Sequence, residues 1–478
     1  MMTEMPSATG VRIAGDRYQW LVAWRACLQL LHEHATGRAG NRLVAVGVEA
    51  RDAGNADDVV LYRSSPPHSY MQVKYAVDAS SPLNLDYLAR EPILRNLIAT
   101  HRRLKAEDGV VEIWLVTNRQ IDSADVLLKD RDSRDRRLVP RALQGGPGSK
   151  RGLARAEWAH EADVDLGELG DFLSDFYIES GYDAEHLRTE VKLLMTANGL
   201  ESDDRAIELG LSWVHDRVVA GERMFDLQSI KQAVDDMGII RSEPWGTVSV
   251  AIVDYDPAAR ESSVSIDRVG RMEGSTPWLR VRPNAPYTWG ELASDIRGTF
   301  RPLKPGRVLV TGFMRQAVGF LVGTELRGVR GFTVATRQHA QLWTSEAPTE
   351  PFPLEIEEVP VGKGEDLAIV LQISYPGADD AADWIRASDL PVDSILVVST
   401  PSIDATSIAT PGIANSVATQ VRNQVRSRLK GVRRLHLFLI GPLGLSILLG
   451  HHWSRMRPTT VYEHIDGAEY EAAFDIDA

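Results

Sequence analysis

The sequence predicts an α/β protein of two domains, and three observations lead to this prediction. The chain has 478 residues, more than a single hydrophobic core usually organises. Residues 10–160 are predicted to form a helix, three short strands, a second helix and a buried strand, an order that fits an α/β nuclease-like core as well as other α/β folds. The second half alternates strands and helices, which implies a parallel sheet with helices on its faces. We place the domain boundary at about residue 240, next to Ser242–Pro244.

Composition limits the function classes. The net charge is −13, so contact with nucleic acid would need a local basic surface. The single cysteine, Cys27, excludes an internal disulfide and a thiolate zinc site. The sequence has no Gly-x-x-x-x-Gly-Lys, Gly-x-Ser-x-Gly or Cys-x-x-Cys motif, which argues against an ATPase, a serine hydrolase and a zinc finger.

The chain shows no targeting or membrane segment. Met1–Gly15 lacks the apolar centre of a signal peptide. The longest apolar stretch, Leu435–Gly450, is shorter than the roughly 20 residues that span a bilayer. We read it as a buried strand that runs into a helix, and we expect a cytoplasmic bacterial protein without membrane contact.

The first domain opens with a predicted helix at Gly15–Ala35, with Asp16 as its N-cap. Cys27 lies on the apolar stripe of this helix and is expected in the core. The further elements are strands at Leu43–Glu49, Asp58–Arg63, Tyr70–Tyr75 and Val110–Thr117, and a helix at Asp86–Glu107. Leu166–Gly238 is predicted to be helical throughout and to close the domain.

Lys129–Arg155 is basic within an acidic chain. It carries nine Lys or Arg against three Asp, and Gln144–Ser149 within it is a Gly/Pro loop. One interpretation is a solvated loop, and the other is a surface that contacts the DNA backbone.

The second domain is predicted from a regular alternation of elements. Its strands are expected at Val248–Tyr255, Arg307–Gly312, Gly331–Thr336, Leu367–Ser374, Ser394–Ser399 and Leu435–Ile440, and its helices at Met314–Arg327, Asp379–Ala387, Pro411–Lys430 and Pro442–His451. Two blocks, about 285–375 and 390–478, are candidates for two similar subdomains.

Polar side chains on two neighbouring strands form the first candidate site. Gln72 and Lys74 are two residues apart, so their side chains share a face, and Asp58 opens the adjacent strand. Hydrolysis of a phosphodiester needs a divalent ion that polarises the phosphate and activates a water. Asp58 and the Gln72 amide oxygen are suitable ligands for Mg²⁺, and Lys74 can neutralise charge in the transition state. The same pattern also fits an edge strand whose polar residues face solvent.

The opening of the chain resembles the nuclease domain of SAVED-domain effectors from bacterial CBASS antiphage systems. The resemblance is carried by Gly15-x-x-Tyr18-Gln19, Val48-Glu49, Asp57-Asp58-Val59, Met71-Gln72-Val73-Lys74 and Thr117-Asn118. It implies a divergent restriction-endonuclease-like fold, in which Gln replaces the usual acidic residue before x-Lys.

The resemblance also implies roles for individual residues. Asp58, Gln72 and Lys74 would form the core of the site, with Gln19 pointing into it. Asp58, Gln72 and Glu49 would hold Mg²⁺ or Mn²⁺. Asp57 is an alternative ligand to Asp58, which we favour because it directly precedes the apolar run at Val59.

His436–Trp453 contains the second candidate site. A buried strand ends at Gly441, and Pro442 stands where the first helical residue is expected, so free N–H groups at the helix start favour an anion. Together with Thr460–His464, this stretch resembles the end of a SAVED domain. The resemblance covers about residues 285–478 and implies two fused CARF-like Rossmannoid units that bind a cyclic oligonucleotide, commonly a cyclic trinucleotide.

Positions at strand ends suggest the ligand contacts, which are Thr311, Gly312, Arg315, Trp343, Ser399, Thr400, Gly441 and Pro442. Arg315 can pair with phosphate, and Trp343 can stack on a base. Such an Arg is more often a solvated helix residue, and such a Trp is more often a half-buried core residue.

These features predict a two-part effector. An endonuclease domain would occupy residues 1–240, with its core at about 10–160 and a helical extension at 161–240, and a SAVED sensor would occupy 241–478. A cyclic oligonucleotide would bind the sensor, promote homo-oligomerisation and switch on cleavage of double-stranded DNA. The resemblance also implies a functional link to a CD-NTase. The alternative is a sensing scaffold with a degenerate nuclease domain, because Gln72 removes a charge from the metal site.

Overall fold

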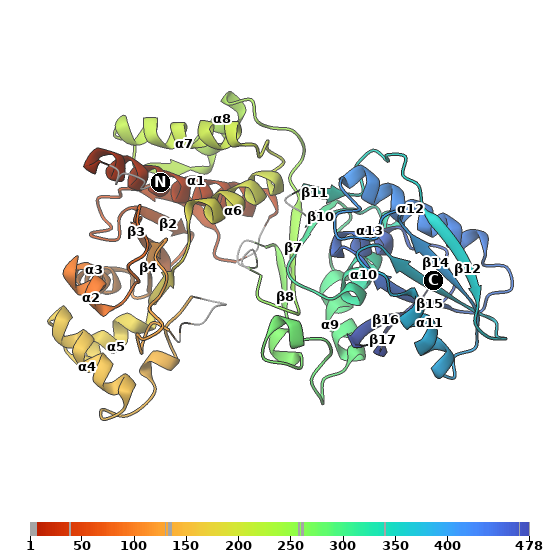
Figure 1. Cartoon of the computed structure of the whole chain (residues 1–478). Helices are drawn as coiled ribbons and strands as arrows, with labels where there is room; N and C mark the ends of the chain where they lie inside the picture. Colours follow the sequence, from red (N-terminus) through yellow and green to blue (C-terminus); the bar gives the residue numbers. More distant parts are fainter. Residues whose placement is uncertain are drawn as a thin grey trace. The chain divides into compact units, whose positions relative to one another are not determined.

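The computed structural model describes residues 7–37, 40–129, 131, 136–256, 259, 262–338, 341–467 and 469–477. The chain divides into two compact units, Met1–Pro244 and Trp245–Ala478 (Figure 1). The N-terminal unit contains one β-sheet and the C-terminal unit contains two, and each unit has two hydrophobic cores.

A six-stranded sheet forms the centre of the N-terminal unit, in the order β5-β4-β3-β2-β1-β6. Its strands are β1 (Leu43–Val48), β2 (Val59–Arg63), β3 (His68–Lys74), β4 (Val111–Thr117), β5 (Phe176–Glu179) and β6 (Met224–Asp226). β1, β2 and β3 pair in antiparallel fashion, whereas β4 runs parallel to both β3 and β5. The carboxyl ends of β3 and β4 therefore lie next to each other, with Lys74 opposite Thr117.

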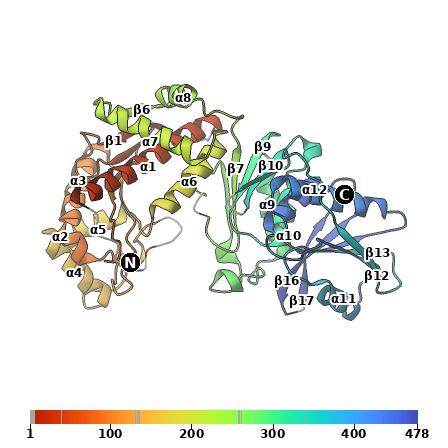
Figure 2. The same ribbon diagram turned by 45° about the horizontal axis from the view of Figure 1, so that its top comes forward.

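Helices cover both faces of this sheet (Figure 2). They are α1 (Ala8–Ala35), α2 (Leu85–Arg90), α3 (Ile93–Asp108), α4 (Lys150–Ala162), α5 (Leu166–Ser174), α6 (Ala184–Ala197), α7 (Asp204–Val219) and α8 (Leu227–Asp236). One core joins strand residues such as Val46 and Val116 to α1, α6, α7 and α8. A second core joins residues such as Val60 and Leu115 to α3, α4 and α5. Side chains alternate along each strand, which divides the apolar residues between the two cores.

Three sequence predictions for this unit are corrected. α1 begins at Ala8, and its N-cap is Ser7 rather than Asp16, because the Ser7 side chain accepts a hydrogen bond from the Gly10 N–H. The predicted helix at 86–107 is two helices, α2 and α3, separated near Pro92, which has no N–H to continue a helix. The stretch predicted to be helical throughout contains β5 and β6, which pair with β4 and β1. Strands of four and three residues are too short to show a period of two.

Two sheets form the C-terminal unit, in the orders β11-β10-β9-β7-β8 and β12-β14-β13-β15-β16-β17. The first sheet consists of β7 (Gly246–Ala251), β8 (Val264–Asp267), β9 (Arg307–Thr311), β10 (Thr333–Gln338) and β11 (Gln341–Thr344). The second consists of β12 (Glu355–Pro360), β13 (Asp366–Gln372), β14 (Val392–Ser399), β15 (Leu435–Ile440), β16 (Thr459–Asp466) and β17 (Glu469–Ile476). The inner strands of both sheets are parallel, and β11, β12 and β17 are antiparallel edge strands.

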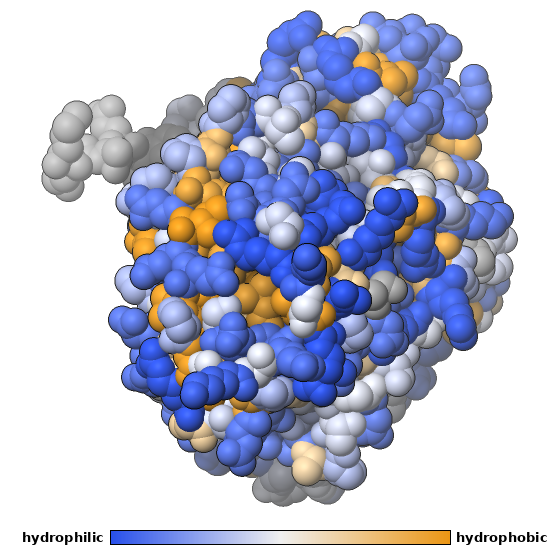
Figure 3. All heavy atoms as spheres, turned by 90° about the vertical axis from the view of Figure 1, so that its right-hand side faces the viewer, coloured by the Kyte–Doolittle hydropathy of each residue, from blue (hydrophilic) through white to orange (hydrophobic). Residues whose placement is uncertain are grey.

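The helices of this unit are α9 (Trp289–Phe300), α10 (Gln316–Glu325), α11 (Ala378–Ala387), α12 (Pro411–Ser427) and α13 (Leu443–His452). One large core joins α9, α10, α12 and α13 to apolar residues of both sheets, and a smaller core joins α11 to the second sheet. The face of this unit at the right of Figure 1 is largely hydrophilic, with apolar side chains grouped between charged ones (Figure 3).

The predicted blocks 285–375 and 390–478 do not match the two sheets. The first sheet already begins at Gly246 and ends at Thr344, and β13 belongs to the second sheet. Five strands were not predicted, namely β8, β11, β12, β16 and β17, and among them β12 has a Glu-rich sequence that does not indicate a strand. The apolar stretch Leu435–Gly450 is β15 followed by α13, as predicted. Among the helices of the described ranges, none has the length and apolarity needed to cross a bilayer.

Glycines bring α10 and α13 into unusually close contact. A Cβ atom added to Gly323 would lie 2.1 Å from the Ile447 carbonyl oxygen, and one added to Gly450 would lie 2.2 Å from that of Phe320. Gly319 meets Leu443 near the helix starts, and Gly323 meets Ile447 one turn later, so the two helices run in the same direction. Their amino ends therefore lie together, beyond the carboxyl ends of β9 and β15.

Candidate functional sites

The first site is built on the β2–β3 hairpin. Val59 pairs with Met71, which brings Asp58 next to Gln72. Asp58 Oδ2 accepts a hydrogen bond from the Val73 N–H at 2.7 Å and a second, very short one from Gln72 Nε2. Burial raises the pKa of Asp58 to about 6, against the lowering effect of the Val73 N–H, and the neighbouring charge of Asp57 adds to the rise. The structure thus brings Asp58 and Gln72 into contact.

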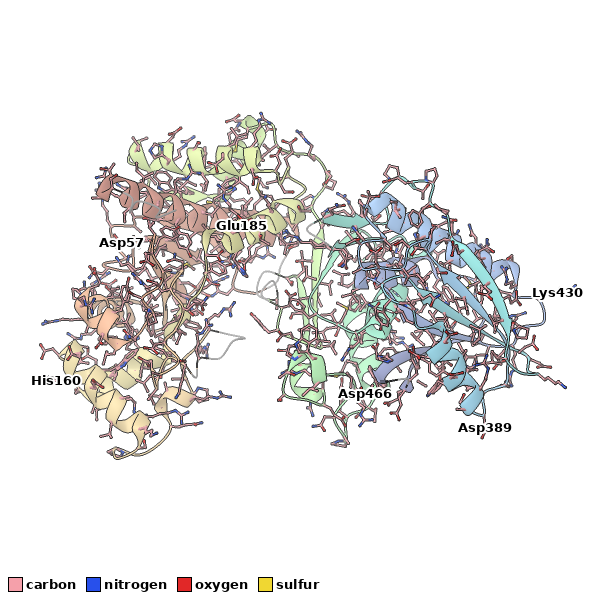
Figure 4. All side chains as sticks on the ribbon, in the orientation of Figure 1. Asp57, His160, Glu185, Asp389, Lys430 and Asp466 are labelled. Atoms are coloured by element: carbon pink, nitrogen blue, oxygen red, sulfur yellow. The ribbon has the colours of Figure 1, made fainter. Side chains whose placement is uncertain are left out.

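Lys74 provides positive charge beside these carboxyl groups. It lies on the same face of β3 as Gln72, and its charge lowers the pKa of both Asp57 and Asp58. Burial, and then the charge of Glu49, raise the pKa of Asp57. Asp57 lies at the start of the hairpin and is labelled in Figure 4. Of the two aspartates, Asp58 is the one whose carboxylate contacts Gln72.

Glu49 and Gln19 reach the same place from β1 and α1. The Glu49 N–H donates to the Asp58 carbonyl oxygen at 3.3 Å, and its side chain pairs with Arg223. Glu49 has a φ of 49°, in the left-handed region that residues other than glycine rarely adopt and that is frequent at functional sites. Gln19 Nε2 lies 3.4 Å from the Asp58 carbonyl oxygen, so Gln19 contacts the backbone and not the carboxylate.

These residues suit a hard divalent ion in donor type. Mg²⁺ is commonly held by one or two carboxylates together with waters, and Asp58, Glu49 and the Gln72 amide oxygen make such a set. Binding an ion would need two side-chain changes. Gln72 now directs its amide nitrogen at Asp58, and the Glu49 carboxylate now pairs with Arg223. A turn of the amide would present the Gln72 oxygen instead. Within the described residues, no group of three or more His, Cys, Asp or Glu side chains is placed to hold a metal ion, so the amide is an essential part of this set.

The basic segment 129–155 is largely engaged with the protein itself, and residues 130 and 132–135 lie outside the described residues. Arg155 donates to the carbonyl oxygens of Ala142, Gln144 and Gly145 at 2.7–3.0 Å, which shapes the Gly/Pro loop. Arg137 donates to the Tyr177 hydroxyl at 3.0 Å. Among the described residues of the segment, the exposed cations are Lys129, Arg137, Arg141 and Lys150. A DNA contact made by the described part of the segment would therefore rest mainly on these four side chains.

The second site lies beyond the carboxyl ends of β7 and β9. Thr311 and Ser249 both donate to Asp256 Oδ2, each at 2.6 Å. Gly312 has a φ of +105°, and an added Cβ would lie 2.2 Å from the Val250 carbonyl oxygen, so only glycine fits. Arg315 is the N-cap residue of α10, and its Nε donates to the Arg280 carbonyl oxygen at 3.0 Å. Arg315 thus holds a loop of its own chain, and the expectation that it pairs with phosphate is not supported by this contact.

Side chains of the protein already occupy part of both helix starts. Pro442 is the N-cap of α13 with a ψ of 139°, so it is not the first helical residue that the sequence predicts. The Gly444 N–H donates to Gln338 Oε1 at 3.2 Å, and Gln316 Nε2 donates to the Gly441 carbonyl oxygen. These contacts join segments more than 100 residues apart, and no local pattern in the sequence indicates them.

Glu463 is a buried carboxyl group at the start of α10. Its Oε2 accepts the Ala317 N–H at 3.0 Å. Burial raises the pKa of Glu463 to about 7, against the lowering effects of the Ala317 N–H and the Arg315 charge. An anion at this helix start would face Glu463, which the sequence interpretation assigned no role.

Three further predicted contacts lie elsewhere in the unit. The Trp343 ring is fully buried between the α13 segment around Gly444 and the core, so the expected stacking on a base is corrected to a core role. Thr400 is buried, and its hydroxyl donates to the Ser402 carbonyl oxygen at 2.6 Å. Ser399 pairs with Gln372, which pairs with Ile440, so Ser399 is two strands, about 10 Å, from the end of β15.

Comparisons with known proteins give a family match within the C-terminal unit and similar solved structures over the whole chain. The family model for SAVED, described as the SMODS-associated and fused to various effectors sensor domain, matches residues 292–476. No curated protein matches this chain. The Acinetobacter baumannii Cap4 SAVED/CARF-domain containing receptor, in its structure with the cyclic trinucleotide 2'3'3'-cAAA, is 13% identical over 100% of both chains, with a TM-score of 0.42. The structure of that receptor with 3'3'3'-cAAA gives the same values. The Moraxella osloensis Cap4 receptor is 12% identical, covers 97% of this chain and 99% of its own, and has a TM-score of 0.41.

Proposed function

Because residues 292–476 form a SAVED sensor domain, we propose that this chain is the effector of a CBASS antiphage system. In this proposal a cyclic oligonucleotide binds the sensor, promotes homo-oligomerisation, and thereby activates cleavage of double-stranded DNA by the N-terminal unit. The observation that carries the nuclease half is the contact of Asp58 with Gln72, beside Lys74 on neighbouring strands. The proposal takes the N-terminal unit as restriction-endonuclease-like and the C-terminal unit as two fused CARF-like halves.

The nuclease residues have separate tasks. Asp58, Glu49 and the Gln72 amide oxygen would hold Mg²⁺ or Mn²⁺. The bound ion would polarise the scissile phosphate and lower the pKa of a water. Lys74 is the cation of this face, and it would hold a phosphate oxygen and neutralise charge that develops in the transition state. Gln19 steadies the backbone of Asp58 and thus fixes the strand end.

The sensor residues suit a ligand that is planar, polar and anionic. Both helix starts point their partial positive charge toward the carboxyl edge of the strands. Glu463 and Gln338 satisfy two N–H groups there, which leaves the remaining N–H donors of the helix starts to attract the ligand. Activation through a second messenger also fits the chemistry, since a nuclease that was always active would damage the DNA of its own cell.

The proposal is tested with purified full-length protein and plasmid DNA. Plasmid should be degraded only when Mg²⁺ and a cyclic trinucleotide such as 3'3'3'-cAAA are both present. Lys74→Ala should abolish cleavage, whereas Lys231→Ala, an exposed lysine on α8, should leave it unchanged. A Lys74→Ala protein that cuts as well as the wild type would show that the site is wrongly assigned.

A specific observation favours a second candidate function, that of a sensing scaffold without catalysis. Gln72 stands where an acidic residue would strengthen the metal site, and it directs its N–H at Asp58. A Gln72→Glu protein that gains cleavage from a wild-type level of zero would favour the scaffold. An active wild type that Gln72→Glu leaves active would favour the nuclease.

A further inference from the structure

Trp278 stands out among the tryptophans of the chain. All eleven lie within the described residues, and Trp278 is the only exposed one, with 87% of its surface accessible. It lies in the short 3₁₀ helix η4 (Pro277–Leu279), and the adjacent Leu279 is also exposed. An indole held in water contributes little burial to the stability of the fold, and together with Leu279 it presents adjacent apolar side chains at the surface.

The loop that carries Trp278 is held in place. Met272 and Pro283 form a bridge at its base, and the Glu273 N–H donates to the Arg282 carbonyl oxygen at 2.9 Å. Gly274 has a φ of +93°, and an added Cβ would lie 2.5 Å from Leu279, so the tip closes tightly on itself. The exposure of Trp278 therefore belongs to a structured loop.

Two arginines tie this loop to the proposed ligand edge. Arg280 donates to the Val253 carbonyl oxygen at 2.7 Å, in the segment that follows β7. Arg315, at the start of α10, donates to the Arg280 carbonyl oxygen at 3.0 Å and lies 3.5 Å from that of Trp278. The Val253 N–H donates to the Phe313 carbonyl oxygen at 2.9 Å, and this hydrogen bond joins the segments after β7 and β9. The backbone of Trp278 is thus fixed at the edge where the helices begin.

Two other exposed aromatic side chains lie on segments that follow the strands at this edge. Phe313 is 51% exposed and lies two residues before Arg315 in the chain. Tyr375 is 52% exposed and follows β13, and its pKa is raised by burial and by the charge of Glu463, against the lowering effect of the Arg315 charge. Positive charge with flat apolar surfaces suits nucleotides, because each base has a face that stacks on an aromatic ring and each phosphate is anionic.

We propose that Trp278 is a platform on which a nucleobase of the bound cyclic oligonucleotide stacks, and that Arg315 and Arg280 are positioning residues that hold this platform. The inference rests on the proposed function, since it needs a nucleotide at the carboxyl edge of the strands. It assigns base stacking to Trp278 and not to the buried Trp343. It also gives Arg315 a structural reason for its place at the N-cap of α10.

Tryptophan fluorescence and calorimetry with 2'3'3'-cAAA and 3'3'3'-cAAA test this inference on the full chain. Wild-type emission should fall on binding, because a base stacked on the exposed indole quenches it. Trp278→Ala should bind about tenfold more weakly or worse and lose this quenching, while Trp278→Phe should keep much of the affinity. Val329→Ala is the matched control, since Val329 is also highly exposed in this unit. Melting temperature shows that each variant is folded.

Arg315→Gln separates positioning from direct contact. It should weaken binding and reduce the fraction of emission quenched at saturation, because the indole is no longer held in place. If Arg315 served stability alone, Arg315→Gln would lower the melting temperature and leave the quenching at saturation unchanged.

The outcomes distinguish the two proposals. If the wild type binds neither trinucleotide, the sensor function itself is overturned, and this inference with it. If the wild type binds and Trp278→Ala binds equally well, the platform is wrong while the sensor stands. If Trp278→Ala instead reduces self-association without ligand and leaves ligand affinity unchanged, the surface serves a second copy of the chain, which overturns the platform.

Discussion

Two carboxyl groups, the half-buried Asp58 in one unit and the buried Glu463 in the other, show how similar hydrogen bonding can serve different tasks. Asp58 and Glu463 each accept a backbone N–H, from Val73 at 2.7 Å and from Ala317 at 3.0 Å. Burial raises the pKa of both, to about 6 and about 7. Asp58 stands at a strand end beside Asp57, Gln72 and Lys74, whereas Glu463 is enclosed at a helix start. The comparison teaches that the environment within reach of the group, and not burial alone, separates a candidate ligand from an internal helix cap.

The largest effect should come from Asp58→Asn. This variant should lose at least about 10³-fold in ligand-activated plasmid cleavage, because the ion loses its charged ligand. Its melting temperature without metal should not fall, since Asn removes a charge that is costly to bury. Mg²⁺ should raise the melting temperature of the wild type but not of the variant.

Asp57→Asn is the matched control for that experiment. It should retain much more cleavage than Asp58→Asn, because Gln72 donates its hydrogen bond to Asp58. If Asp57→Asn instead lost more cleavage than Asp58→Asn, the metal ligand would be Asp57, and Asp58 would not be the candidate ligand in this comparison.

The next effect should come from Gly323→Val. A side chain there meets backbone atoms of α13, so the helices must separate, at a cost of about 3 kcal/mol or more. Thermal unfolding should show a large loss of stability, accompanied by loss of ligand binding. Gly298→Val, on α9 with open space around its Cα, is the control and should change much less. Equal stability of Gly323→Val and the wild type would contradict the close helix contact.

Glu463→Gln should change the pH dependence of stability. The pKa of Glu463 is about 7 in the folded protein and about 4.5 when unfolded, so its protonated form is favoured by folding. Its contribution is therefore fully present below about pH 4.5 and is lost as the pH rises through 7. Gln keeps an oxygen for the Ala317 N–H without the charge, so at pH 8 the variant should be about 2–3 kcal/mol more stable. Denaturant unfolding of both proteins at pH 5 and pH 8 measures this. If the difference in stability between the variant and the wild type is the same at both pH values, Glu463 stays ionised in the folded protein.

The smallest effect should come from Gln338→Ala. It frees the Gly444 N–H at the start of α13, with a cost of about 1 kcal/mol in stability. An anionic ligand can use the freed donor, so affinity for the cyclic trinucleotide should rise a few-fold or stay level. A large loss of affinity would show that Gln338 itself touches the ligand.

Local features of the sequence were sufficient for the strand pairing at the first site, whereas the choice of its residues rested on the family resemblance. The alternation in Met71–Lys74 and the short turn before it place Gln72, Lys74 and Asp58 on adjacent strands, and the structure has this pairing. The metal role, the cofactor and the cleavage itself stay predictions. They depend on an ion and a partner that no spacing of residues can demonstrate.

The second site depended on contacts between distant segments. Arg315 holds residues 278 and 280, Glu463 reaches Ala317, and Gln338 reaches Gly444. A strand-end position correctly indicated where such residues gather but not which of them were already engaged by the protein. Trp343 was misjudged for the same reason, because its burial comes from the packing of α13 and not from its own strand.

The glycine contact between α10 and α13 has a consequence for signalling. Where main-chain atoms touch, no flexible side chain lies between the helices to absorb a small displacement. A ligand that shifts the start of one helix must then carry the other with it, and with it the strands that each helix follows. The two sheets thereby share a stiff mechanical connection, through which a ligand bound at their common edge would displace both sheets of the C-terminal unit together.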